Sequence, residues 1–367
     1  MPGTASPVTP TQARQTQLDQ GAVSDGDLQR RYRIMGIWLL LCCAVLLALV
    51  AVGGATRLTG SGLSITEWNP MSGALPPMSA ERWQQEFELY RQSPEYQEIN
   101  RGMSMSEFQF IYWWEWGHRQ LARFLGLIFA VPLAWFWWRG WIPSQMRWPL
   151  VGLIALGGLQ AWMGWYMVQS GLVDEPRVSQ YRLAAHLGLA LLIYVGMLWL
   201  ALRLIWPVHA QPHRLRAVPW VLGLVGLTIV SGAFVAGLKA GYVFGTFPLM
   251  GGQWLPPGGL YLEPAWRNLF DNPATVQFIH RVLGVATVLA AAGLWVWSWR
   301  RPLSASQRLA LHAVALLALL QVTLGIATLV LSVPIKLAVA HQAVAVLLLS
   351  AVLVLLHCSR NREGVGV

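Results

Sequence analysis

The chain has 367 residues, of which 55% are hydrophobic and only 11% are charged, and its mean hydropathy is +0.47. Soluble globular domains carry about 25% charged residues, so this composition excludes that class and predicts an integral membrane protein. The formal net charge of +10 is then expected to reflect membrane topology and anionic lipid. It does not indicate a nucleic-acid partner.

Residues 1–33 are polar and mixed in charge and lack the apolar run of a signal peptide, so we expect a disordered cytoplasmic tail there. Eight apolar windows follow, and each is long enough to cross a hydrocarbon core, which takes roughly 20 residues. The long segment 57–110 contains a candidate amphipathic helix near 80–100, which we expect either to cap a binding site or to dock a partner. The predicted spans are 34–56, 117–138, 148–168, 183–206, 218–238, 275–298, 308–331 and 336–357.

The distribution of charge predicts the orientation of these spans. With an inside N-terminus and eight crossings, the inner side carries 14 arginines against 4 acidic residues. The outer side carries 12 basic and 12 acidic residues, which cancel. The positive-inside rule therefore predicts that both termini are cytoplasmic.

The chain contains an internal repeat that divides it into two similar halves. Both copies begin on the same side, so we predict two four-helix bundles related by an axis along the membrane normal. The predicted organisation is a tail at 1–33, a bundle at 34–206, an inner linker at 207–217, a bundle at 218–357 and a cytoplasmic tail at 358–367. The matched motifs are Gly54-Ala55 with Gly232-Ala233, Leu159-Gln160 with Leu320-Gln321, Gly164 with Gly325, and His118-Arg119 with His280-Arg281.

Four histidines lie a few residues inside spans, all at the predicted outer ends, and each half holds one pair. Imidazole within a membrane is costly and therefore indicates a function. A haem standing between two facing helices would take one axial imidazole from each, so we predict two haem-iron sites. One is formed by His118 and His186, and the other by His280 and His341. A metal site built from histidine alone is the alternative, although the aromatic-rich, carboxylate-poor surroundings favour haem.

One residue distinguishes the two halves. Glu115 lies three residues before His118 and shares its helix face, whereas the residue three before His280 is Gln277. A carboxylate beside a haem ligand can accept protons or position water, so Glu115 is the candidate catalytic residue. An ion pair with Arg119 or Arg123 is the alternative role for Glu115.

Five basic residues lie near the level of the four histidines. They are candidates for binding haem propionates, with a snorkelling role at the membrane interface as the alternative. They are Arg57, Arg119, Arg123, Lys239 and Arg281.

Several segments of the chain resemble heme A synthase of the proteobacterial and mitochondrial type. They are the run GGATRLTGSGLS at 53–64, the segment WEWGHR at 114–119, and His186, His280-Arg281 and His341-Gln342. The resemblance covers about 34–357. It implies oxidation of the C8 methyl of haem O to a formyl group through a hydroxylated intermediate, giving haem A for cytochrome c oxidase.

The same resemblance implies roles for the candidate residues. His118 and His186 would ligate the substrate haem O, Glu115 would serve catalysis, and His280 and His341 would ligate a cofactor haem b. The implied setting is the bacterial inner membrane. The implied partners are haem O synthase, the cytochrome c oxidase assembly pathway and a membrane electron acceptor, while the sequence leaves a homo-oligomer open.

Two other function classes remain open at this point. A dihaem b-type cytochrome that moves electrons from quinol would share the histidines, but it would bind haem without converting it and would not need Glu115. A transporter built from parallel repeats would need broken helices and a polar site at the membrane midplane, whereas the polar groups here crowd the outer end.

Overall fold

The computed structural model describes residues 24–69, 72–171, 178–206 and 215–360. Within these residues the regular structure is helical, apart from one isolated β-bridge between Met250 and Gln253. Eight of the described helices are long and apolar enough to cross a membrane, which confirms the predicted all-α membrane fold. They are α2 (Asp25–Leu58), α5 (Met105–Trp138), α6 (Ser144–Gly171), α7 (Gln180–Ile205), α8 (Val218–Gly237), α10 (Pro273–Ser298), α11 (Ala305–Val330) and α12 (Ile335–Cys358).

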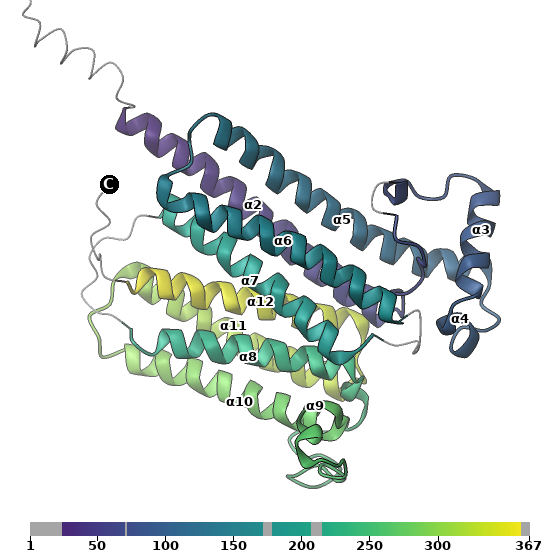
Figure 1. Cartoon of the computed structure of the whole chain (residues 1–367). Coiled ribbons are helices and arrows are strands. Elements are labelled where there is room, and N and C mark those ends of the chain that lie inside the picture. The colour runs from purple at the N-terminus through teal and green to yellow at the C-terminus, as the bar shows by residue number, and fades with distance from the viewer. Residues whose placement is uncertain (1–23, 70–71, 172–177, 207–214, 361–367) are drawn as a thin grey trace, which may run out of the picture.

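The eight long helices lie side by side, with the first four above the last four in the view of Figure 1. In the C-terminal half, contacts run from α8 to α10, from α10 to α11, from α11 to α12, and back to α8. In the N-terminal half, α2 packs on α5 and α7, and α6 packs on α7. The halves meet where α2 contacts α12 and α7 contacts α8 and α12. The axis that relates the two predicted bundles stays a prediction.

A continuous apolar core joins the two halves. It includes Met35 of α2, Ala201 of α7, Val218 of α8 and Val352 of α12, none of which has any exposed surface. Helix α7 is the most enclosed of the eight spans. Because lipid tails are as apolar as these side chains, close van der Waals packing between the helices, and not removal from water, is the stabilising contribution here.

Helices α2 and α5 begin 9 and 12 residues earlier than the sequence predicts, and the other spans begin within four residues of their predicted starts. α2 begins at Asp25, inside the predicted tail 1–33, because the Ser24 side chain accepts a hydrogen bond from the Asp27 N–H (3.2 Å) and caps the helix. α5 begins at Met105 and not at 117, because Ser104 and Glu107 form a capping box. Hydropathy locates the apolar part of a helix and misses the polar turns before it. Residues 1–23, 207–214 and 361–367 of the predicted tails and linker lie outside the described residues.

One end of the bundle, which we call the loop end, carries the long connections: α2, α6, α8 and α11 end there, and α5, α7, α10 and α12 begin there. The predicted amphipathic helix of segment 57–110 is present at this end as α3 (Ala80–Arg91), followed by α4 (Pro94–Glu98) (Figure 1). We call 80–98 the α3–α4 cap. It packs on the start of α5 through an aromatic cluster that includes Phe87, Tyr90 and Phe108.

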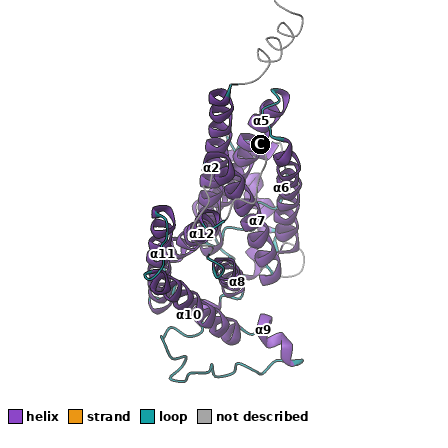
Figure 2. Ribbon diagram, turned by 90° about the vertical axis from the view of Figure 1, so that its left-hand side faces the viewer, coloured by secondary structure: helices purple, strands orange, loops and turns teal. Residues whose placement is uncertain are grey.

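The corresponding connection in the C-terminal half, between α8 and α10, has less helix. It contains α9 (Asn268–Asp271) and two short 3-10 helices, η2 (Ala240–Tyr242) and η3 (Ala265–Arg267), while η1 (Ser72–Ala74) precedes the cap. Figure 2 shows this connection as an extended loop beside α9. The two halves therefore differ most at the loop end.

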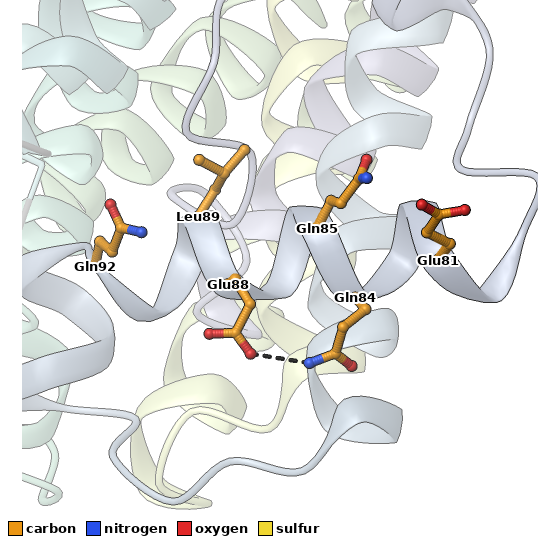
Figure 3. A pocket seen from close by; sticks show the side chains of 6 residues that line it. All are labelled: Glu81, Gln84, Gln85, Glu88, Leu89 and Gln92. Carbon is orange, nitrogen blue, oxygen red and sulfur yellow. Dashed lines mark hydrogen bonds between the residues drawn. The ribbon is translucent and has the colours of Figure 1, made fainter.

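A shallow depression lies along α3 of the cap (Figure 3). Most of its lining residues have polar or charged side chains, but they line it with their apolar atoms, and the Gln84 side chain donates a hydrogen bond to Glu88 (2.9 Å). The depression is formed by one helix alone, and none of its lining residues is a predicted site residue. The four histidines lie outside this depression. The lining residues are Glu81, Gln84, Gln85, Glu88, Leu89 and Gln92.

Candidate functional site

The four predicted ligand histidines lie on four different helices toward the loop end. His186 of α7, His280 of α10 and His341 of α12 lie six or seven residues after the first residue of their helices. His118 lies thirteen residues after Met105, because α5 continues beyond the apolar span into the α3–α4 cap. Three of the four histidines therefore lie about two turns from the start of their helix, close to the predicted depth. His118 lies further along α5 because this helix begins with polar turns that hydropathy does not detect.

His280 and His341 face each other across the C-terminal half. Their ring centroids are 6.4 Å apart and the ring planes are nearly perpendicular, at 89°. Two imidazoles that bind one metal ion through Nε2 bonds of about 2 Å need ring centres about 6 Å apart. The observed spacing therefore fits axial ligation of a single iron. In the N-terminal half, His118 and His186 lie close enough to interact electrostatically.

A glycine on a neighbouring helix lies against each of the four imidazole rings. A Cβ atom built on any of these glycines would stand within 3.2 Å of the Cε1 atom of its histidine. A larger residue would push the ring aside, so the four glycines fix where the rings lie. The distances are 2.9 Å for Gly53 and His118, 3.2 Å for Gly164 and His186, 3.1 Å for Gly232 and His280, and 2.9 Å for Gly325 and His341.

This role of the glycines was missed from sequence, although three of them were noticed as marks of the repeat. The structure also changes one detail of that match. Gly53, and not Gly54, has the position that corresponds to Gly232, because it is Gly53 that lies against a histidine. Gly54 instead lies against the side-chain amide of Gln342, across the boundary between the two halves.

The Nδ1 atom of each imidazole has a hydrogen-bond partner in the C-terminal half but not in the N-terminal half, among the described residues. In the C-terminal half, Nδ1 of His280 lies 2.8 Å from the hydroxyl of Ser231, and Nδ1 of His341 lies 3.1 Å from the carbonyl oxygen of Gln321. In the N-terminal half, the Nδ1 atoms of His118 and His186 are buried without a hydrogen-bond partner among the described residues. Such outer hydrogen bonds orient metal-binding histidines.

The residues present fit a haem in each half. Each pair offers two imidazoles, to which a porphyrin adds the equatorial ligands of the iron. In the described part of the chain, no cluster of three or more histidine, cysteine, aspartate or glutamate side chains could hold a metal ion. Two glutamine amides, Gln160 and Gln321, lie 3.3 and 3.5 Å from the Nε2 atoms of His186 and His341, the nitrogens that would bind an iron.

Glu115 is buried at the loop end of α5, with 3% of its surface exposed. Its Oε2 accepts hydrogen bonds from the Ser64 hydroxyl (2.7 Å) and the Ile65 N–H (2.9 Å), and its Oε1 pairs with Arg119 at 2.6 Å. Three donors therefore hold the two carboxyl oxygens in place. The alternative ion pair with Arg119 is therefore present, and it fixes the carboxylate in a defined orientation.

Comparisons with known proteins identify the family of this chain. Residues 36–353 match the family described as cytochrome oxidase assembly protein. Heme A synthase of Nitrosomonas eutropha is 48% identical over 339 residues, covering 90% of this chain and 95% of that protein. Heme A synthase of Agrobacterium fabrum is 50% identical over 323 residues, covering 86% and 88%. This chain belongs to the heme A synthase family.

In this heme A synthase family member, two of the propionate candidates keep an unused donor. Arg57 donates through Nη2 to two carbonyl groups at the end of α8, and Arg281 donates to the carbonyls of Phe244 and Thr246. The Nε atoms of both arginines are buried without a partner among the described residues. Arg57 and Arg281 therefore remain able to bind a carboxylate.

The other three propionate candidates are engaged differently. Arg119 pairs with Glu115 and donates to the carbonyls of Ile65 and Glu67, and Arg123 donates to the carbonyl of Asn69 (3.2 Å). Lys239 is exposed. The interactions of Arg119 and Arg123 anchor the segment before the α3–α4 cap to α5.

A second buried carboxyl group near the site was missed from sequence. Glu95 of α4 is 7% exposed and accepts a hydrogen bond from the Tyr90 hydroxyl (3.3 Å), which in turn accepts one from Asn100 (2.7 Å). Burial and the nearby charge of Glu115 raise the pKa of Glu95 to about 7, and Lys239 opposes the shift. Nothing in the sequence marks Glu95, because it belongs to a short polar helix whose burial depends on packing against α5.

Proposed function

We propose that this chain oxidises the C8 methyl group of haem O to a formyl group through a hydroxylated intermediate, giving haem A for cytochrome c oxidase. Membership of the heme A synthase family supports the overall activity. The substrate haem O is bound by His118 and His186, and the cofactor haem b by His280 and His341. The enzyme is a membrane-bound oxidoreductase.

The difference between Glu115 and Gln277 is the observation that carries this division of labour. Both residues lie three positions before a ligand histidine and are buried at 3% exposure. Glu115 is a carboxylate that can hold or release a proton, whereas Gln277 is an amide that cannot. Proton transfer therefore accompanies the haem bound by His118, which marks the N-terminal half as the substrate half.

The atoms of Glu115 have separate roles in this proposal. Oε1 is paired with Arg119, so the proton is held at Oε2, which faces the hydroxyl of Ser64. Ser64 also lies within hydrogen-bond distance of the carbonyl of Ser61 (3.2 Å), so its hydroxyl can turn away when Glu115 is protonated. Arg57 and Arg281 bind the propionates of the haems in the N-terminal and C-terminal halves through their free Nε donors.

The proposed reaction also needs an electron acceptor, a membrane location and pathway partners. Oxidation of a methyl group releases electrons, and haem b, when bound, supplies a one-electron relay toward a membrane electron acceptor. The enzyme lies in the bacterial inner membrane with both termini in the cytoplasm, because positive charge gathers on that side. Haem O synthase delivers the substrate, and the cytochrome c oxidase assembly pathway receives the product.

The test is chromatographic analysis of haems extracted from membranes of a host that makes haem O but no haem A, with and without this chain. We expect a new peak of haem A, or of the hydroxylated intermediate, only when the chain is expressed. If the purified protein carries haem B while haem O stays unchanged, the proposal is overturned in favour of a dihaem b-type electron-transfer cytochrome.

A further inference from the structure

The hydroxyl of Ser231 determines which nitrogen of His280 is free. Ser231 lies one residue before Gly232 on α8, and its Oγ donates a hydrogen bond to the carbonyl of Thr228 (2.7 Å). Since the hydroxyl proton is used there, Oγ accepts from Nδ1–H of His280 at 2.8 Å. This arrangement protonates Nδ1 and leaves the lone pair of Nε2 free for a metal.

His341, the second proposed ligand in this half, is also protonated on Nδ1. Nδ1 of His341 lies 3.1 Å from the carbonyl oxygen of Gln321, which can only accept. Nδ1 is therefore protonated here as well, and Nε2 is again the free nitrogen. Both imidazoles of the C-terminal half are fixed in orientation before any haem arrives.

The N-terminal half lacks this support. Gly53 corresponds to Gly232, since each lies against a ligand histidine, so the residue that corresponds to Ser231 is Val52. Valine has the shape of threonine but no hydroxyl. The buried Nδ1 atoms of His118 and His186 have no hydrogen-bond partner among the described residues.

We propose that Ser231 is a positioning residue that slows the loss of haem from the C-terminal site, with the carbonyl of Gln321 as a second support. Val52 at the corresponding position lacks the hydroxyl, so haem leaves the N-terminal site more readily. The inference rests on the proposed function, in which one haem is a resident cofactor and the other is a substrate that must leave. Removing an outer hydrogen bond of this kind typically lowers metal affinity 10- to 100-fold. The hydrogen bond also raises the basicity of the imidazole and so favours the oxidised iron.

The test uses an isosteric pair of variants at position 231, in full-length protein purified with its haem. Ser231→Val removes the hydroxyl, and Ser231→Thr keeps it in a side chain of the same shape. The rate of haem b transfer to excess apomyoglobin and the midpoint potential of haem b are measured, and neither requires turnover. We expect transfer from Ser231→Val to be about 10- to 100-fold faster and its potential to move in the positive direction, while Ser231→Thr stays near the wild type.

The reverse change tests the other half. Val52→Thr adds a hydroxyl beside His118, and with His280→Ala removing the resident haem we expect haem added to the purified protein to leave the N-terminal site about 10-fold more slowly than with Val52. Equal transfer rates and potentials for Ser231→Val and Ser231→Thr would overturn the proposal, as would haem loss from both variants. Failure of the proposed function would show instead as unchanged haem O in membranes, whatever these rates are.

Discussion

Glu115 and Gln277 occupy corresponding positions, three residues before His118 and His280, and their hydrogen bonds run in opposite directions. Glu115 accepts from the backbone N–H of Ile65 (2.9 Å), whereas Gln277 donates to the backbone carbonyl of Phe244 (3.1 Å). The adjacent loops present opposite backbone groups to the two positions. A negative charge is therefore accommodated beside one histidine pair only.

Replacing Glu115 with glutamine tests the role of its charge. Glu115→Gln keeps the size of the side chain but loses the ion pair with Arg119 and the ability to hold a proton at Oε2. We expect conversion of haem O to fall by at least about 100-fold, the usual contribution of a general acid or base, while haem remains bound. Chromatography of extracted haems measures the conversion.

The matched control is Glu107→Gln on the same helix. Glu107 is exposed and serves the capping box, a position that glutamine also fills. We expect this variant to convert haem O at the wild-type rate. Wild-type production of haem A by Glu115→Gln would contradict a catalytic role for Glu115.

Removing ligands of the C-terminal half should remove the resident haem. The proposed ligation of haem b by His280 and His341 predicts that the b-type absorption spectrum of the purified protein disappears in His280→Ala and in His341→Ala. In His118→Ala or His186→Ala, that spectrum should persist while haem A production stops. An unchanged spectrum in either C-terminal variant would refute the assignment of haem b to that pair.

The glycine beside each imidazole offers a test that leaves the ligands themselves intact. In Gly232→Ala, the new Cβ would stand 3.1 Å from Cε1 of His280, so the ring must shift from its place. We expect a loss of haem b content of about 10-fold, the lower limit for disturbed ligand orientation. Haem content per protein is measured from the pyridine haemochrome spectrum.

Gly226→Ala on the same helix is the control for this change. A Cβ at Gly226 meets nothing within 4 Å, and alanine is the better helix former by about 1 kcal/mol. Its haem content should equal that of the wild type. Equal haem content in both variants would show that contact with Gly232 does not set the position of His280.

The stability of the α3–α4 cap should depend on pH through Glu95. The pKa of Glu95 is about 7 in the folded protein and 4.5 for an ordinary glutamate, so the folded state holds a proton that the unfolded state has lost between these values. The free energy of unfolding should therefore fall as pH rises from about 4.5 to 7, by about 3 kcal/mol in total. Unfolding in detergent micelles, followed by tryptophan fluorescence, measures this dependence.

Glu95→Gln should flatten that dependence, because the amide does not titrate and can still accept from Tyr90. Glu98→Gln on the same short helix is the control, since Glu98 is exposed, and it should leave the dependence unchanged. A slope that survives in Glu95→Gln would assign the pH dependence to another group.

The positions of the eight spans, and the placement of four histidines toward one end of them, were predictable from sequence. Apolar runs of sufficient length have few structural alternatives in a membrane, and histidine is costly enough there to stand out. The contrast between Glu115 and Gln277 was also predictable, because these residues occupy matched positions of a repeat. Helix starts were less predictable, since capping by Ser24 and Ser104 involves polar residues outside the apolar runs.

The tertiary structure alone decided how these residues are supported. Three features depend on contacts between helices far apart in the chain. Gly53 and Gly232 lie against histidines, and Glu95 is buried. Ser231 accepts a hydrogen bond from His280, whereas Val52 cannot accept one from His118. The sequence determined the membrane fold and its histidine pairs, because hydropathy and the cost of polar groups act on each segment separately. The environment of each imidazole was decided by packing, because hydrogen bonds and close contacts across a bundle depend on the rotation and register of several helices at once.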